Sequence, residues 1–363
     1  GSGTWSFNSP GITADDTYPV TATAIDGAGN TATDTINFTI DSTAPTIANP
    51  TPTEGTTVTD ATQTYTVNIT DDTSGVDSDS ITVSVDDANG SVLSNAGTGD
   101  SNVSFDGTTL TVDGQTYADG QVTVTVDADD NASNSATTFT SNFTVDANGP
   151  TVNNFSPADG SSVNSTPGNI TFNVSDTVTG ANLSTLSVRL TNNGTVLDGV
   201  GTSNDNITVS GETVSIDLTS NNGAAINLEE GDVTTDVSVD DTVGNTGIGN
   251  ATFTYDTTSP TINSVNLTDD GSENASFTFN SSEELSQINV TIEDPSNSTF
   301  VTLDETDFTF SNGTYTLQTE VAYNDQNTGE YEAFVNDAID AAGNNGGNNG
   351  DGSGLSNSYN TTA

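Results

Sequence analysis

The stretch that decides the fold is residues 118–134, Ala118-Asp119-Gly120-Gln121-Val122-Thr123-Val124-Thr125-Val126-Asp127-Ala128-Asp129-Asp130-Asn131-Ala132-Ser133-Asn134. A Gly turn is followed by apolar residues at every second position, and then by an Asp with an Asn four residues later. Alternation with a period of two is typical of a β-strand with one buried face. The stretch therefore predicts a half-buried strand that ends in a tight polar loop.

The same pattern occurs four times along the chain. The loop aspartates are Asp26, Asp130, Asp241 and Asp340, which lie 104, 111 and 99 residues apart. This spacing is the size of one small β domain. Three of the loops are followed by an Asp-to-Pro connector, namely Asp41 to Pro45, Asp146 to Pro150 and Asp256 to Pro260. Proline restricts its own φ and favours extended geometry in the preceding residue, so each connector is read as a short, stiff boundary.

These boundaries predict a first repeat at 1–41, a second at 42–146, a third at 147–256 and a fourth at 257–363. The first repeat is incomplete, because Trp5 and Phe7 match Leu110 and Val112 and no earlier strands precede them. Two explanations stay open. Either the sequence is cut from a longer repeat protein, or a neighbouring chain supplies the missing strands.

Within each complete repeat, short alternating runs are separated by Gly, Asn and Asp. The residues expected in the core are Tyr65, Val67, Ile69, Ile81, Val83, Val85, Ile170, Phe172, Val174, Leu186, Val188, Leu190, Phe277 and Phe279. No segment shows a reliable helical period. About seven short strands per repeat predict an all-β chain of two-sheet sandwiches.

The composition excludes several classes of protein. The chain has 51 acidic residues, a single basic residue and no His or Cys, for a formal charge of -50. It therefore lacks imidazole, thiolate and Schiff-base chemistry, and one Arg cannot neutralise the phosphates of a nucleic acid. No apolar run approaches the roughly 18 residues of a membrane helix, so we expect no membrane span in this segment.

A charge this large would oppose compaction in dilute buffer. At about 1 M salt the Debye length is only about 3 Å, so neighbouring carboxylates barely repel one another. The composition thus indicates a protein of a halophilic organism. The alternative is an acidic secreted protein whose charge is balanced by bound calcium.

These loops and connectors resemble the tandem immunoglobulin-like (Ig-like) domains of bacterial and archaeal cell-surface proteins. Asp71-Asp72-Thr73-Ser74-Gly75-Val76-Asp77 resembles the B–C loop of that family, between its second and third strands. With the acidic composition, the chain is most similar to haloarchaeal surface-layer glycoproteins. The resemblance implies an all-β fold of tandem Ig-like β-sandwich domains in a linear array. It says little about activity.

Acceptor motifs for N-glycosylation, Asn-x-Ser/Thr, occur 21 times. Much of this number follows from the abundance of Asn, Ser and Thr. The candidate acceptors are Asn37, Asn68, Asn102, Asn142, Asn173, Asn182, Asn206, Asn250, Asn266, Asn289 and Asn312. They support a glycosylated extracellular surface.

Other polar features have structural explanations. The loop aspartates are expected to accept hydrogen bonds from backbone N–H groups two residues further on. Arg189 lies between Val188 and Leu190, so it should point outward and pair with an acid. The carboxylates cluster in loops of sandwiches that rarely form deep clefts, so we expect no catalytic residues.

The linker, the B–C loop and the F–G loop, between the last two strands, should meet at the same end of each sandwich. This predicts three groups of acids: Asp41, Asp71, Asp72 and Asp130; Asp146, Asp176 and Asp241; and Asp256, Glu283 and Asp340. Converging carboxylates suit calcium, which accepts six to eight oxygen ligands. The alternative is a solvated acidic surface without bound metal. No other cofactor is expected.

The resulting hypothesis is a non-enzymatic structural subunit of a halophile cell envelope, in a surface layer or a surface filament. Its partners would be copies of itself and glycans, at an extracellular location. Two alternatives stay open: an adhesin or receptor-binding stalk whose binding head lies elsewhere, and accessory domains of a secreted hydrolase.

Overall fold

The computed structural model describes residues 6, 11–219, 224–269, 274–322, 329–347 and 356–361. The chain divides into two compact units. The first comprises Gly1–Pro150, Asp176–Ala181 and Asp240–Gly247, and the second comprises Thr151–Ser175, Asn182–Val239 and Ile248–Ala363. In the described part of the chain, every paired strand has its partner in the same predicted repeat.

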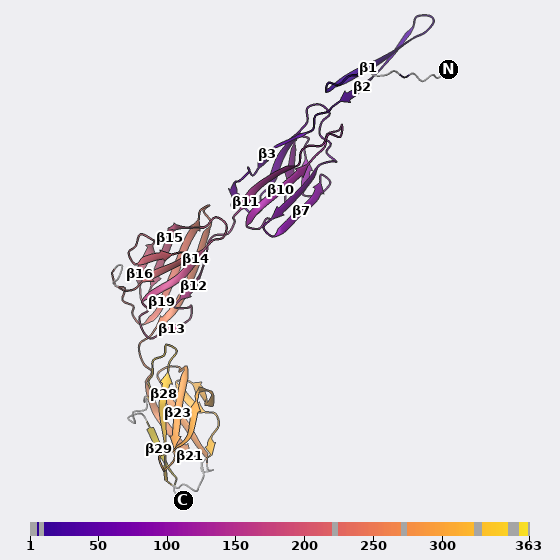
Figure 1. Ribbon diagram of the computed structural model, residues 1–363. Helices are drawn as coiled ribbons and strands as arrows, with labels where there is room; N and C mark the ends of the chain where they lie inside the picture. The colour runs from indigo at the N-terminus through magenta and orange to yellow at the C-terminus, as the bar shows by residue number, and fades with distance from the viewer. Residues whose placement is uncertain are drawn as a thin grey trace. The chain divides into compact units, whose positions relative to one another are not determined.

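The described part of the first repeat contains two antiparallel strands, β1 (Asp16–Ile25) and β2 (Thr31–Ile40) (Figure 1). Their register pairs Tyr18 with Phe38 and Val20 with Ile36. Paired residues share one face of the hairpin, and Ile36 on this face is 64% exposed. The strand expected around Trp5 and Phe7 lies outside the described residues.

The second repeat is a two-sheet sandwich. Its strands are β3 (Thr46–Thr51), β4 (Thr57–Val58), β5 (Tyr65–Thr70), β6 (Thr82–Asp87), β7 (Gly90–Gly97), β8 (Val103–Phe105), β9 (Thr109–Val112), β10 (Gly120–Asp127) and β11 (Phe139–Val145). One sheet has the order β3-β5-β9-β8 and the other the order β4-β11-β10-β6-β7. β4 pairs in parallel with β11, so the N-terminal segment contributes a strand to each sheet. This is the strand order of an Ig-like sandwich.

The third repeat has the same topology. Its strands are β12 (Thr151–Ser156), β13 (Ser162–Val163), β14 (Asn169–Ser175), β15 (Ala181–Thr191), β16 (Thr195–Val200), β17 (Ile207–Ser210), β18 (Thr213–Asp217), β19 (Gly231–Asp241) and β20 (Thr246–Tyr255). The sheet orders are β12-β14-β18-β17 and β13-β20-β19-β15-β16, and β13 pairs in parallel with β20.

The fourth repeat varies this plan. Its strands are β21 (Ile262–Asp269), β22 (Asn274–Ser281), β23 (Gln287–Glu293), β24 (Thr299–Asp304), β25 (Phe308–Ser311), β26 (Thr314–Leu317), β27 (Val321–Ala322), β28 (Gly329–Ile339) and β29 (Ser356–Thr361). One sheet has the order β21-β22-β26-β25, with β27 also paired to β22, and the other has the order β24-β23-β28-β29. The only helical segment among the described residues is the short 3-10 turn Glu305–Asp307.

The alternating residues predicted as core are all buried. In the second repeat Tyr65, Val67 and Ile69 from one sheet pack with Val83 and Val85 from the other and with Ile81, which directly precedes β6. All six side chains are fully buried. Burial of each such side chain contributes about 1.5–3 kcal/mol, which makes these cores the main source of stability. The all-β sandwich prediction is therefore confirmed.

The expected count of about seven strands per repeat was too low. The described residues form nine strands in the second repeat and nine in the third. β4 and β13 are only two residues long, which is too short to leave an alternating pattern in the sequence.

Candidate metal centres at the repeat junctions

The B–C loops fold around an aspartate. Oδ1 of Asp71 accepts hydrogen bonds from the backbone N–H groups of Thr73, Ser74 and Gly75 at 3.2, 3.0 and 2.7 Å. Gly75 closes this turn with a φ of 78°, a left-handed value that glycine adopts without strain. Asp176 is held in the same way in the third repeat, by the N–H groups of residues 178–180 at 3.0, 3.0 and 2.7 Å.

The F–G loops fold around a second aspartate, as the sequence predicts. Oδ1 of Asp130 accepts hydrogen bonds from the N–H groups of Ala132 and Asn134, both at 2.8 Å. Its Oδ2 accepts a hydrogen bond from the Asn134 amide at 2.6 Å. Asp26, Asp241 and Asp340 repeat the arrangement with Asn30, Asn245 and Asn344. The structural role predicted for these aspartates is confirmed.

The F–G loop asparagines also bind the linkers. The amide Nδ2 of Asn134 donates to the backbone carbonyl of Asp41 at 3.1 Å. Asn245 donates to the carbonyl of Asp146 at 2.8 Å, and Asn344 to that of Asp256 at 2.8 Å. Each asparagine therefore joins the linker aspartate to the aspartate of its own loop.

These contacts bring three groups of carboxylates together. The groups are Asp41, Asp71 and Asp130; Asp146, Asp176 and Asp241; and Asp256, Glu283 and Asp340. Within each group, one oxygen from every residue lies within 4.8 Å of the others. Calcium binds oxygen at about 2.3–2.6 Å, so oxygens on opposite sides of one ion can be about 5 Å apart. Asp72 is exposed and outside the first group, because its neighbour Asp71 takes the inward position of the B–C turn.

The middle group has a feature that points to a ligand. Asp146 is fully buried, and its Oδ1 has no hydrogen-bond partner. Its Oδ2 accepts a hydrogen bond from the Thr179 hydroxyl at 2.5 Å. Burial raises the pKa of Asp146, and the nearby carboxylates of Asp176, Asp241 and Asp119 raise it further against the effect of Thr179. A buried carboxylate oxygen without a partner is costly, and a bound cation would remove that cost.

Burial and hydrogen bonds shift the pKa values of Glu283, Asp130 and Asp241. Burial raises the pKa of Glu283, and Asp256 and Asp340 add to the increase. Burial also acts on Asp130 and Asp241, but the amides and N–H groups of their loops outweigh it and leave both pKa values lowered. Hence the carboxylates of Asp130 and Asp241 are held in the ionised form that metal binding requires.

Two glycines near the junctions were not singled out from the sequence. A Cβ on Gly247 would lie 1.8 Å from the carbonyl oxygen of Pro150, and a Cβ on Gly346 would lie 1.8 Å from that of Pro260. Both glycines come two residues after an F–G loop asparagine. The signal that could have found them is this fixed offset in the third and fourth repeats.

The predicted glycan acceptors differ in exposure. Asn37, Asn250, Asn266 and Asn312 are exposed. Asn68, Asn102, Asn142, Asn173, Asn182 and Asn289 are half-buried. Asn206 is buried, and its amide donates hydrogen bonds to the carbonyls of Asp217 and Ala224 at 2.7 and 3.0 Å. The folded third repeat thus leaves no room for a glycan on Asn206.

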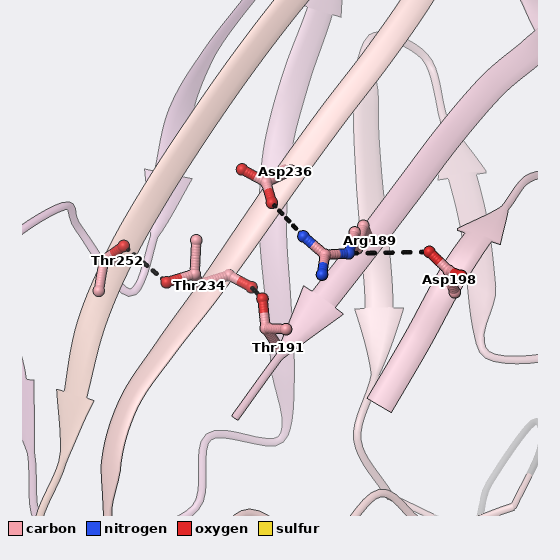
Figure 2. Close-up of polar contacts among 6 residues, drawn as sticks. All are labelled: Arg189, Thr191, Asp198, Thr234, Asp236 and Thr252. Carbon is pink, nitrogen blue, oxygen red and sulfur yellow. Dashed lines mark hydrogen bonds and ion pairs between the residues drawn. The ribbon is translucent and has the colours of Figure 1, made fainter. Parts of the chain in front are cut away.

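Arg189 points outward between two acids, as expected (Figure 2). Its guanidinium lies 3.7 Å from Asp198 and 3.7 Å from Asp236. A shallow groove of about 450 Å³ lies beside it, with Ile248 and Asn250 in its lining. Exposed pairs of this kind contribute less than about 1 kcal/mol, and salt weakens them further.

None of the helical structure in the described residues is long and apolar enough to cross a membrane.

Comparison with known proteins gives limited matches. Residues 1–42 match the family model described as a bacterial Ig-like domain. No curated protein matches the chain. Among solved structures, the chain is similar to a tetra-tandem repeat in the extending region of a large adhesion protein, with 22% identity, a TM-score of 0.29, and coverage of 96% of this chain and 81% of that chain. It is also similar to extracellular cadherin domains 3–6 of protocadherin gamma B2, with 14% identity, a TM-score of 0.31, and coverage of 88% and 79%.

These TM-scores are low, so the assignment of the fold rests on the strand orders and cores described above. The chain is a tandem series of Ig-like β-sandwich repeats.

Proposed function

We propose that the chain is a non-enzymatic structural subunit of a halophile cell envelope, in a surface layer or a surface filament. The observation that carries the proposal is the formal charge of -50 on a chain whose repeats have continuous apolar cores. Such repeats can pack tightly, but their surface charge needs concentrated salt to screen it. Serial sandwiches of this type suit a load-bearing role between copies of the same chain.

Calcium at the repeat junctions is the second part of the proposal. The orphan Oδ1 of Asp146 supports it most directly, since a cation is the partner that this oxygen lacks. Asp176 and Asp241 would complete the protein ligands in the third repeat, and the equivalent groups would bind calcium in the second and fourth. A cation shared by the linker and two loops would stiffen each junction.

Glycans are the third part. The exposed acceptors Asn37, Asn250, Asn266 and Asn312 are the sites we expect to be modified on an extracellular surface. Their side chains face solvent, so a glycan there displaces no core residue.

The test is to examine the envelope of the native host. The protein should be a dominant band in an envelope preparation, and electron tomography with a specific antibody label should place it in a regular lattice or filament. A minor band with scattered label would overturn the lattice or filament role and support an adhesin or stalk. Glycosidase activity or protease activity that copurifies with the band would support accessory domains of a hydrolase.

A further inference from the structure

Each linker is bound by an acid from the repeat that precedes it. These acids are Asp15, Asp119 and Glu230, and they come directly before β1, β10 and β19 respectively. They lie 26, 27 and 26 residues before the linker aspartates Asp41, Asp146 and Asp256. We call these three residues the linker-binding acids.

The first of them binds the two residues that follow Asp41. Oδ1 of Asp15 accepts hydrogen bonds from the N–H and the hydroxyl of Ser42, at 3.1 and 2.9 Å. Its Oδ2 accepts a hydrogen bond from the Thr43 hydroxyl at 2.7 Å. Both carboxylate oxygens of Asp15 are therefore used by the linker.

The second and third make equivalent contacts with different chemistry. Asp119 accepts hydrogen bonds from the N–H of Ala147 at 2.9 Å and the amide of Asn148 at 2.5 Å. Glu230 accepts hydrogen bonds from the N–H of Thr257 at 3.1 Å and from its hydroxyl. It also accepts a hydrogen bond from the Thr258 hydroxyl at 2.9 and 2.8 Å, one distance to each of its oxygens.

Hydroxyl donors keep two of these acids charged. The Thr43 and Ser42 side chains lower the pKa of Asp15, and the Thr257 and Thr258 side chains lower that of Glu230. Charge-assisted hydrogen bonds of this kind are stronger than neutral ones. The preceding repeat thus binds the linker residues that directly follow the linker aspartate. The F–G loop asparagine of the following repeat binds the backbone carbonyl of that aspartate.

The linker-binding acids do not belong to the three carboxylate groups themselves. The contacts of Glu230 are to Thr257 and Thr258, so it can act on a cation only through the position of Asp256. Without its hydrogen bonds to Glu230, the linker would hold the Asp256 carboxylate in the position for cation binding only part of the time. The apparent affinity for a cation falls in proportion to that fraction.

We propose that Asp15, Asp119 and Glu230 are positioning residues that set the cation affinity of the junction that follows them. The inference rests on the proposed cation sites. In other metal sites, mutation of the residues that hydrogen-bond and orient the metal ligands lowers the affinity for the metal by about 10- to 100-fold. We expect Glu230→Gln to weaken calcium binding by about tenfold or more at the third junction, with the other two unchanged.

The experiment titrates calcium into the full-length chain in molar salt and follows hydrogen exchange in peptides around Asp130, Asp241 and Asp340. Each peptide reports one junction, so each gives its own midpoint calcium concentration for protection from exchange. The matched control is Glu229→Gln, which removes the same charge from the same loop while the Glu229 carboxylate contacts Asn193 rather than the linker. Glu230→Asp keeps the carboxylate and should retain most of the affinity, as Asp serves at the other two junctions.

The outcomes separate the two proposals. A midpoint that rises for Glu230→Gln in the Asp340 peptide alone, and not for Glu229→Gln, supports the positioning role. Equal midpoints for the wild type and both variants would overturn that role while leaving the cation sites intact. A wild-type chain without any calcium-dependent protection would overturn the cation sites. Exchange in chelator serves as the structural control, because a variant that merely loosens the fold would lose protection there too.

Discussion

Replacing Asp146 by Asn should stabilise the third repeat in the absence of calcium and remove most of the stabilisation that calcium gives it. Asp146 is fully buried, and its Oδ1 lacks a partner. An unsatisfied buried polar group costs about 1–3 kcal/mol, and a charged one more. In chelator, Asp146→Asn should therefore raise the free energy of unfolding by about 1–3 kcal/mol, provided that the Asn oxygen keeps the hydrogen bond from Thr179.

Calcium should stabilise the wild type alone. At a calcium concentration about 100 times the dissociation constant, one site contributes about 2.7 kcal/mol. Asp146→Asn removes a charged ligand and should lose nearly all of this increment. The calcium response of the third repeat is thus the clearest difference between the two proteins.

The pH dependence gives an independent check. The folded-state pKa of Asp146 is raised, so its ionised form disfavours folding. The penalty is absent below its unfolded-state pKa and develops as the pH rises through the folded-state pKa. In chelator, the advantage of Asp146→Asn over the wild type should therefore be largest near neutral pH and shrink as Asp146 becomes protonated.

The assay is native-state hydrogen exchange in molar salt, read on the core strands β14 and β19 of this repeat. Asp205→Asn is the matched control, since it removes the same charge from an exposed position of the same repeat. If Asp146→Asn lowered stability in chelator as much as in calcium, the carboxylate would be an ordinary hydrogen-bond acceptor. The argument from its unpaired oxygen would then be refuted.

Three further predictions concern the whole chain and the glycines. Transfer to about 0.1 M monovalent salt should loosen or unfold the repeats, because screening of the net charge of -50 is lost. An unchanged circular dichroism spectrum and melting temperature in dilute, chelated buffer would contradict the halophile assignment. Protein from the native host should carry glycans at several exposed acceptors such as Asn250, and an intact mass equal to that of the bare chain would argue against an extracellular location. Gly247→Ala should destabilise the third repeat by about 1–3 kcal/mol in thermal unfolding, because its Cβ would overlap the carbonyl of Pro150. The control Gly168→Ala should be nearly neutral in the same assay, because a Cβ at residue 168 would have no atom within 4 Å.

Local patterns were enough to predict the sandwich. Tyr65, Val67 and Ile69 alternate in the sequence, and all three are buried in one strand. The turn around Asp130 could also be predicted, because its hydrogen bonds reach only two and four residues along the chain. Features of this kind depend on neighbours in sequence, so a single sequence contains them.

The membership of the three carboxylate groups could be predicted in outline from the topology of the fold. Its details could not. Asp71 and Asp72 are equivalent in the sequence, and only the B–C turn makes one inward and the other exposed. Asn206 carries an intact acceptor motif, yet its amide is bound by carbonyls at residues 217 and 224.

The linker-binding acids and the burial of Asp146 were decided by tertiary structure alone. Asp119 and its linker partners are 28 and 29 residues apart, and Asp146 and Thr179 are 33 apart. In a chain with 51 acids, the regular spacing of these few marks their positions, but it does not show which groups their carboxylates contact. Alternation and turns follow from the period of the backbone, whereas the surroundings of one carboxylate depend on which distant segments the folded sheets bring beside it.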